Sequence, residues 1–150
     1  MTREMEHMTR AVQESTKLSQ NGDPLKALEL LDNSMAVAVR ENWNRALETI
    51  SRHAAIIAES SGDLARAKSY NERTLACAPE NPMALYGMAK ILSEQGETEL
   101  ARDYAERCYK VSLRGGTDVD RARVELLGKH WPEFGEWRVD GEIPGPVTAG

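Results

Sequence analysis

The stretch Ser60-Ser61-Gly62-Asp63-Leu64-Ala65-Arg66-Ala67 decides the fold, because its pattern occurs twice more in the chain. The other copies are Gln20-Asn21-Gly22-Asp23-Pro24-Leu25-Lys26-Ala27 and Glu94-Gln95-Gly96-Glu97-Thr98-Glu99-Leu100-Ala101. In each copy a glycine ends an apolar-periodic stretch, an acidic residue follows it, and an alanine stands five positions after the glycine. Glycine ends a helix in the left-handed conformation without steric cost, and an acidic side chain suits the start of the next helix. The pattern therefore predicts three helical hairpins.

Apolar residues recur at helical spacing on both sides of each turn. Their spacing predicts helices over about residues 5–21, 25–40, 43–60, 64–78, 82–95, 98–113 and 118–129. Asn42 is the expected N-cap of the third helix, and Asp118 is that of the seventh. Side chains expected to face the core include Val39, Leu100, Val119 and Leu126.

The spacing of the turns narrows the kind of repeat. Gly62 and Gly96 are 34 residues apart, whereas Gly22 and Gly62 are 40 apart, and we place the extra residues in longer helices around residues 40–43. A unit of 34 residues with helix, turn and helix is the length of a tetratricopeptide repeat. Small or apolar residues, the turn glycine and the closing proline stand at the expected positions of the best copy: Ala54, Ala55, Ala58, Gly62, Ala67, Leu75 and Pro79.

On these residues the chain resembles the tetratricopeptide repeat family over about residues 9–113, in a degenerate version without the family's full tryptophan and tyrosine signature. The resemblance implies an all-α, right-handed superhelix of three hairpins followed by a C-terminal capping helix. The repeat domain would cover residues 1–130, with repeats at about 5–40, 43–78 and 82–113 and the capping helix at 118–129. Residues 131–150 would form an aromatic turn and a loose tail.

Composition limits the classes of partner. The net charge is −5 and the isoelectric point about 5.3, so a general attraction to nucleic acid or to an anionic membrane is disfavoured. The first ten residues lack the apolar run of a secretory signal, and no 18 apolar residues follow one another. We therefore expect a cytoplasmic protein with no nucleic-acid partner and no membrane partner.

Catalytic and metal-binding motifs are absent from the sequence. There is no phosphate-binding glycine loop, nucleophile elbow, HExxH pair or calcium-binding loop. His7, His53 and His130 stand far apart, and Cys77 and Cys108 lie in apolar helical stretches without a CxxC pattern, as reduced, packed cysteines do. We therefore expect no enzymatic activity, no cofactor and no metal.

The resemblance also implies a binding surface. In this family the first helix of each hairpin lines a concave groove that holds a segment of a partner protein. Counting back from each turn glycine places the following residues in that groove: Thr9, Val12, Thr16 and Ser19, then Thr49, Arg52, Ile56 and Glu59, then Met83, Tyr86, Lys90 and Ser93. Arg52 and Lys90 could pair with acidic groups, and Val12, Ile56 and Met83 could hold apolar anchors.

The leading hypothesis is a non-enzymatic interaction module or adaptor that binds a protein or peptide segment. One alternative is a three-repeat cytosolic chaperone of a type III secretion type system, which the size, acidity and layout would fit. Another is a self-associating module, a homodimer formed through the aromatic residues Trp131, Phe134 and Trp137, which alternatively fold back onto the cap.

Overall fold

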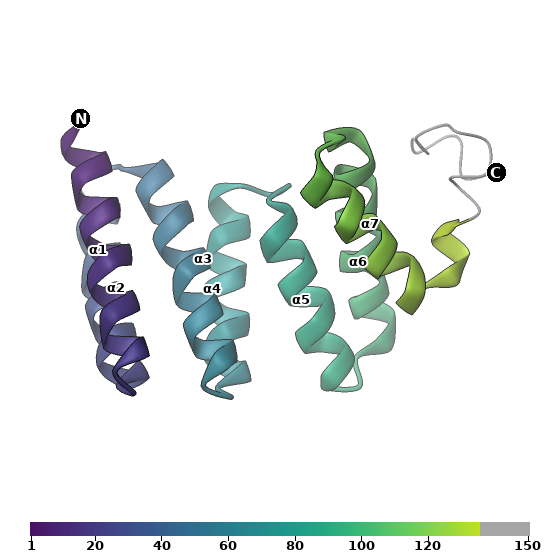
Figure 1. Ribbon diagram of the computed structural model, residues 1–150, viewed down its shortest axis with the longest axis horizontal. Helices are drawn as coiled ribbons and strands as arrows, with labels where there is room; N and C mark the ends of the chain where they lie inside the picture. The colour runs from purple at the N-terminus through teal and green to yellow at the C-terminus, as the bar shows by residue number, and fades with distance from the viewer. Residues whose placement is uncertain (136–150) are drawn as a thin grey trace. The chain divides into compact units, whose positions relative to one another are not determined.

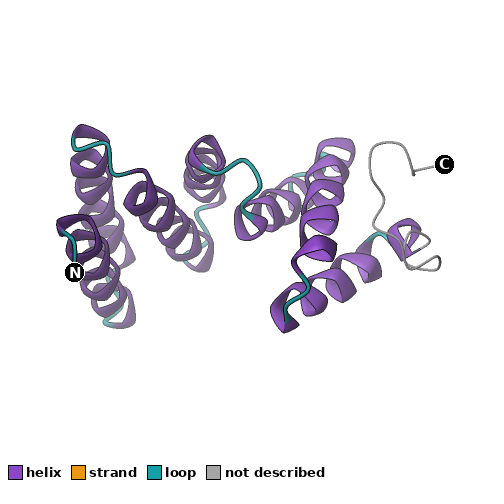
Figure 2. Ribbon diagram, turned by 90° about the horizontal axis from the view of Figure 1, so that it is seen from above, coloured by secondary structure: helices purple, strands orange, loops and turns teal. Residues whose placement is uncertain are grey.

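The computed structural model describes residues 1–135, and every regular element in that part of the chain is helical (Figure 1). The elements are α1 (Arg3–Gln20), α2 (Pro24–Arg40), α3 (Asn44–Ser60), α4 (Leu64–Cys77), α5 (Pro82–Glu94), α6 (Thr98–Gly115), α7 (Asp118–His130) and the 3₁₀ helix η1 (Pro132–Gly135). Figure 2 shows them joined by short loops, with no strand among the described residues. The predicted all-α class is confirmed, with three helical hairpins followed by a further helix.

The chain divides into two compact units. The first covers Met1–Pro79 and holds α1 to α4, and the second begins at Glu80 and holds α5 to α7 with η1. In the first unit α1 packs on α2, α3 packs on α4, and α2 and α1 both contact α3. In the second unit α5 packs on α6, and α7 packs on α6 and η1.

The three glycine turns have one backbone geometry. Gly22, Gly62 and Gly96 have φ angles of +83°, +84° and +80°, in the left-handed region that favours glycine. Asp23 and Asp63 each accept a hydrogen bond from a backbone N–H in the first turn of the helix that follows. The hairpin turns therefore form by the local mechanism that the sequence indicates.

The loop between α2 and α3 corrects one prediction. Asn42 is not an N-cap: it has a φ of +59°, and it stands where glycine stands in the other turns. Its hydrogen bonding is also the same, because Trp43 N–H donates to Ala38 O just as Asp63 N–H donates to Ala58 O. Asparagine tolerates the left-handed conformation better than other non-glycine residues. Left-handed residues therefore recur every 20 positions in the first unit, at 22, 42 and 62.

The N-terminus of α3 is capped from another helix. Trp43 occupies the N-cap position and its side chain makes no capping hydrogen bond. Instead the Glu4 carboxylate of α1 accepts a hydrogen bond of 3.0 Å from the backbone N–H of Ala46. The Trp43 ring contacts two side chains of α1: the His7 ring lies 5.4 Å away between centroids, and the Arg3 guanidinium lies 5.8 Å from the Trp43 centroid. This cluster ties the start of α1 to the start of α3.

Each unit has its own buried core. The largest fully buried apolar side chains of the first unit are Leu28, Leu31, Met35 and Ile50, and those of the second are Leu85, Met88, Ile91, Leu92, Tyr109, Leu127 and Phe134. Alanines fill the close approach of the hairpin helices: Ala27, Ala67 and Ala101 have no exposed surface. Each of these alanines stands five residues after a turn glycine, where a small side chain lets the two helices approach closely.

Four side chains that were expected inside are exposed. Val39 is 52% exposed, Leu100 46%, Val119 64% and Leu126 40%. Each belongs to a wide apolar stripe of which only the central part meets a neighbouring helix, so the edge of the stripe stays in water. In α7 the inward residues are Val124 and Leu127.

The start of α7 corrects a further prediction. Thr117, not Asp118, is the N-cap, and it forms a capping box with Asp120. The Thr117 hydroxyl accepts from the Asp120 N–H at 3.0 Å, and the Asp120 carboxylate accepts from the Thr117 N–H at 3.1 Å. Hydrogen bonds from Thr117 hold the pKa of the Asp120 carboxyl below its usual value. A capping box pairs an N-cap threonine with an acidic residue three positions later, which here is Asp120 rather than Asp118.

Candidate partner-binding surface

The residues predicted to line the groove lie on the first helix of each hairpin. Thr9, Val12, Thr16 and Ser19 belong to α1, Thr49, Arg52, Ile56 and Glu59 to α3, and Met83, Tyr86, Lys90 and Ser93 to α5. All of them are half-buried or exposed. The first eight belong to the first unit and the last four to the second, so each set forms a surface of its own unit.

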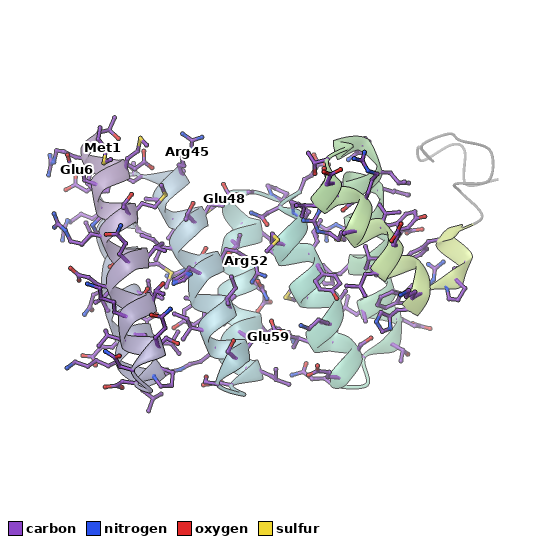
Figure 3. The ribbon with its side chains drawn as sticks, in the orientation of Figure 1. Met1, Glu6, Arg45, Glu48, Arg52 and Glu59 are labelled. Carbon is purple, nitrogen blue, oxygen red and sulfur yellow. The ribbon has the colours of Figure 1, made fainter. Side chains whose placement is uncertain are left out.

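Arg52 is the most constrained side chain of the α3 surface. Figure 3 shows Glu48, Arg52 and Glu59 one below another along α3, and the Arg52 Nη1 donates to Asn71 Oδ1 of α4 at 3.3 Å. Arg52 Nε is buried and has no hydrogen-bond partner among the described residues. Burial lowers the pKa of the Arg52 guanidinium from its ordinary value, and the charge of Glu59 partly opposes that shift.

Asn71 is a buried neighbour of Arg52 that the sequence did not indicate. Its side chain is fully buried, and its Nδ2 has no hydrogen-bond partner among the described residues. The Arg52 and Asn71 side chains are thus in contact, and each has one buried N–H donor for which no described residue supplies an acceptor. An asparagine among the inward positions of α4 was the available signal, because a buried amide requires partners.

A buried hydroxyl pair lies in the same helix pair. Ser51 Oγ and Thr74 Oγ1 are 2.8 Å apart, and both residues have no exposed surface. Thr74 Oγ1 also donates to the Tyr70 carbonyl at 3.0 Å. These bonds fix the position of α4 against α3, so they help to hold Asn71 beside Arg52.

On α1, the predicted groove residue Thr16 is engaged within the protein. Its hydroxyl donates to the Val12 carbonyl at 2.7 Å and lies 3.2 Å from Nε2 of His53 on α3. Burial lowers the pKa of the His53 imidazole below its ordinary value of 6.5. The α1 and α3 faces are thus joined by a polar contact that the sequence did not indicate.

The α5 face of the second unit combines an aromatic ring with a cation. Lys90 Nζ lies 5.8 Å from the centroid of the Tyr86 ring, one helical turn away. Met83 is 41% exposed, and its sulfur lies 3.7 Å from Nη2 of Arg123 on α7. These side chains offer apolar, aromatic and positively charged contacts on one helix face.

The aromatic segment after α7 packs on the second unit. Phe134 is fully buried, its ring centroid is 5.1 Å from that of Tyr109 and 6.0 Å from that of Trp131, and the Arg102 guanidinium lies 5.5 Å from its ring centroid. Arg102 also pairs with Glu133 at 3.2 Å. Phe134 therefore has no surface to offer a second copy in this arrangement. Trp137 lies outside the described residues.

Both cysteines, Cys77 and Cys108, are free thiols. Cys108 is buried, its Sγ donates to the Pro82 carbonyl at 3.3 Å, and burial raises its pKa to about 11. Cys77 is half-buried and carries no disulfide. Within residues 1–135, no group of three His, Cys, Asp or Glu side chains is placed to hold a metal ion. No helix of that region has both the length and the hydropathy needed to cross a membrane.

Comparisons with known proteins bear on the fold. No family model and no curated protein sequence matches the chain. Among solved structures, the chain is similar to the C-terminal TPR-containing domain of a protein described as an FK506-binding protein of Plasmodium falciparum. That match has a TM-score of 0.63 and 14% sequence identity, and it covers 91% of this chain and 97% of the other. The chain therefore has the fold of a tetratricopeptide-like helical repeat protein.

Proposed function

We propose that this chain is a non-enzymatic interaction module that binds a segment of a partner protein on the exposed face of α1 and α3. The α5 face offers a corresponding surface in the second unit. The proposal assigns the module to the cytoplasm, as the acidic charge and the free thiols suggest. No cofactor, nucleic acid or membrane has a part in it.

The observation that supports the proposal most is the unsatisfied donor of Arg52, a half-buried cation that is held against the fully buried Asn71. A buried N–H group without an acceptor costs about 1–3 kcal/mol, and an incoming acceptor removes that cost. Because Arg52 is only half-buried, its side chain can turn its N–H groups toward a ligand. A backbone carbonyl or a carboxylate of the partner would supply the acceptor.

The neighbouring side chains narrow the chemistry of the segment. Ile56 stands one helical turn after Arg52 and is 41% exposed, so it can contact an apolar side chain of the partner. Glu59 lies one turn further along α3. The best match is a segment that places an apolar residue beside an acceptor group, with no acidic residue near Glu59.

The test compares two double variants of equal charge change. Arg52→Gln with Lys90→Gln alters the proposed surfaces, whereas Lys17→Gln with Arg40→Gln alters exposed cations outside the predicted groove set. Partners captured from the source cytosol by the wild type are identified by mass spectrometry, and the binding segment is then titrated calorimetrically.

We expect at least a tenfold loss of affinity for the first double variant and none for the control. The single variants then assign the loss to Arg52 in the first unit or Lys90 in the second. Equal affinity of both double variants, with unchanged circular dichroism, would remove these surfaces from the function. No observation on the described residues favours the secretion chaperone or the homodimer.

A further inference from the structure

The first hairpin carries a groove on the side turned away from the rest of its unit. It has a volume of about 390 Å³ and is lined by residues of α1 and α2: His7, Leu18, Lys26, Glu29, Leu30, Asn33, Ser34 and Val37. Leu18, Leu30 and Val37 are half-buried and give the groove an apolar floor. Lys26 and Glu29 are exposed and flank it on α2.

The part of the groove that α2 forms faces away from α3 and α4, whereas His7 at its α1 side also contacts Trp43. On α2, Asp32 accepts a hydrogen bond of 2.7 Å from the Tyr70 hydroxyl, so its side of the helix is the one that meets α4. Leu30 stands two residues earlier, which is more than half a turn around the helix. Figure 1 shows α3 and α4 on one side of the first hairpin only. The groove is therefore an outer face of the first unit.

The equivalent face of the second hairpin, on α4, packs against another helix of the same unit. A shift of 40 residues superposes the two turns, Gly22 on Gly62, and it maps Leu30, Asn33 and Val37 onto Tyr70, Arg73 and Cys77. In the second hairpin helix α2 lies along part of this face: Tyr70 is buried, but Arg73 stays exposed, and an open pocket of about 280 Å³ remains that is lined by Asp32, Arg66, Ser69, Tyr70 and Arg73. Helix α2 packs on α3, Tyr70 donates to its Asp32, and Arg73 Nη1 lies 3.7 Å from its Met35 sulfur.

We propose that the groove of the first hairpin is a second docking site, which binds an amphipathic α-helix of a partner protein in the way that the second hairpin binds α2. The bound helix runs parallel to α2, because Asp32 and Met35 meet Tyr70 and Arg73 in the same chain order. This site is independent of the proposed α1 and α3 surface.

The host residues specify the partner helix. Leu30 stands at the position that Tyr70 occupies in the second hairpin. The residue of the partner helix that contacts Leu30 should therefore be apolar, rather than a hydrogen-bond acceptor such as Asp32. Leu18 replaces Ala58, which extends the apolar floor toward the turn. Lys26 and Glu29 favour an acidic and a basic residue on the borders of the apolar stripe. The helix α2 itself cannot be donated by a second copy, because Leu28, Leu31 and Met35 are fully buried within their own unit.

The probe is a synthetic peptide with the sequence of residues 23–41 and the change Asp32→Leu. It keeps the apolar stripe of α2, and the leucine replaces the one acceptor that would otherwise meet the apolar Leu30. A control peptide carries Leu28→Asp and Leu31→Asp in addition. Each is titrated into the ¹⁵N-labelled full chain, and amide shifts are followed. We expect the first peptide to shift Leu18, Leu30 and Val37, with submillimolar affinity, and the control peptide to shift none of them.

Two variants of the full chain test whether the peptide binds in this groove. Leu30→Glu puts a charge on the apolar floor, and Asn33→Trp blocks the groove from an exposed position that leaves folding intact. Each should weaken the peptide at least tenfold, whereas Val39→Glu, at an exposed position elsewhere on α2, should not.

Three results would overturn the proposal. The first is an absence of groove shifts at 1 mM peptide. The second is a set of shifts at Thr9 and Thr49 instead, which would assign the peptide to the α1 and α3 surface. The third is self-association of the wild type in light scattering that Leu30→Glu abolishes, which would make a second copy the occupant.

Discussion

The Glu4 carboxylate on α1 accepts a hydrogen bond from the Ala46 backbone N–H in the first turn of α3, at 3.0 Å. The two residues are 42 positions apart. A helix N-terminus leaves four backbone N–H groups without intrahelical partners, and the local side chain, Trp43, cannot accept. A cap that would ordinarily be local is thus a tertiary contact, which couples the start of α1 to the start of α3.

Replacing Glu4 by Ala should therefore lower the stability of the first unit. A lost cap costs about 0.5–2 kcal/mol, and Glu4→Gln should retain most of it because the amide oxygen still accepts. The measurement is urea unfolding followed by circular dichroism. The matched control is Glu6→Ala at an exposed position of the same helix turn. Equal destabilisation by Glu4→Ala and Glu6→Ala would show that the cap contributes nothing.

At the left-handed positions 42 and 62, a glycine should be tolerated and a residue with a larger side chain should lower the stability. Gly62→Ala should destabilise the chain by about 1 kcal/mol, because a side chain at a φ of +84° is strained. Asn42→Gly should leave the stability unchanged or raise it slightly, whereas Asn42→Val should cost more than Gly62→Ala. Thermal unfolding of the three variants measures the order of their stabilities. If Asn42→Val proves neutral, the left-handed geometry at position 42 is wrong.

Phe134 should be the residue that closes the second unit. Truncation of a buried phenylalanine to alanine costs about 3–5 kcal/mol, and its ring contacts Tyr109 and Trp131. We expect Phe134→Ala to lower the unfolding midpoint strongly and to change the tryptophan fluorescence. Leu126→Ala, at a 40% exposed position of α7, should have a small effect. A Phe134→Ala protein as stable as Leu126→Ala would mean that η1 does not cap the unit.

His53 should make the first unit less stable in acid. Burial lowers the pKa of its imidazole in the folded chain below the ordinary value of 6.5, so the unfolded chain takes up the proton first. The contribution is present above pH 6.5 and is lost as the pH falls through the folded pKa. Urea unfolding at pH 7.5 and pH 5.5 measures the loss.

His53→Gln should reduce that pH dependence, since glutamine can keep the contact with Thr16 but does not titrate in this range. An NMR titration of the imidazole provides the direct check. A His53 pKa at or above 6.5 in the folded chain would contradict the assignment of the shift to burial.

The repeat turns could be predicted from the sequence because their causes are local. Gly22, Gly62 and Gly96 take positive φ angles and Asp23 and Asp63 cap the following helices, as the residue types require. Asn42 could not be recognised in the same way, because asparagine serves both as an N-cap and as a left-handed residue. Here Asn42 is the left-handed residue that ends α2, and Glu4 accepts from the Ala46 N–H of α3 in place of a local cap.

The candidate surface likewise has a part that could be predicted from the sequence and a part that could not. The positions of Arg52 and Ile56 on one face of α3 were expected from the resemblance to the repeat family, and neither side chain is fully buried. Its pairing with Asn71 does not, since the two residues meet only when α4 folds back on α3. The contact between Thr16 and His53 likewise depends on how α1 lies against α3.

By itself the sequence determined the all-α class, the hairpin turns and the central positions of the buried helix stripes, because backbone conformation and hydrophobic periodicity act over a few residues. Only the tertiary structure decided which polar groups are buried together, which helix end is capped from a distance and which apolar face receives no helix. Those features depend on the register between packed helices, and register is set by the sum of many side-chain contacts rather than by any short stretch of chain.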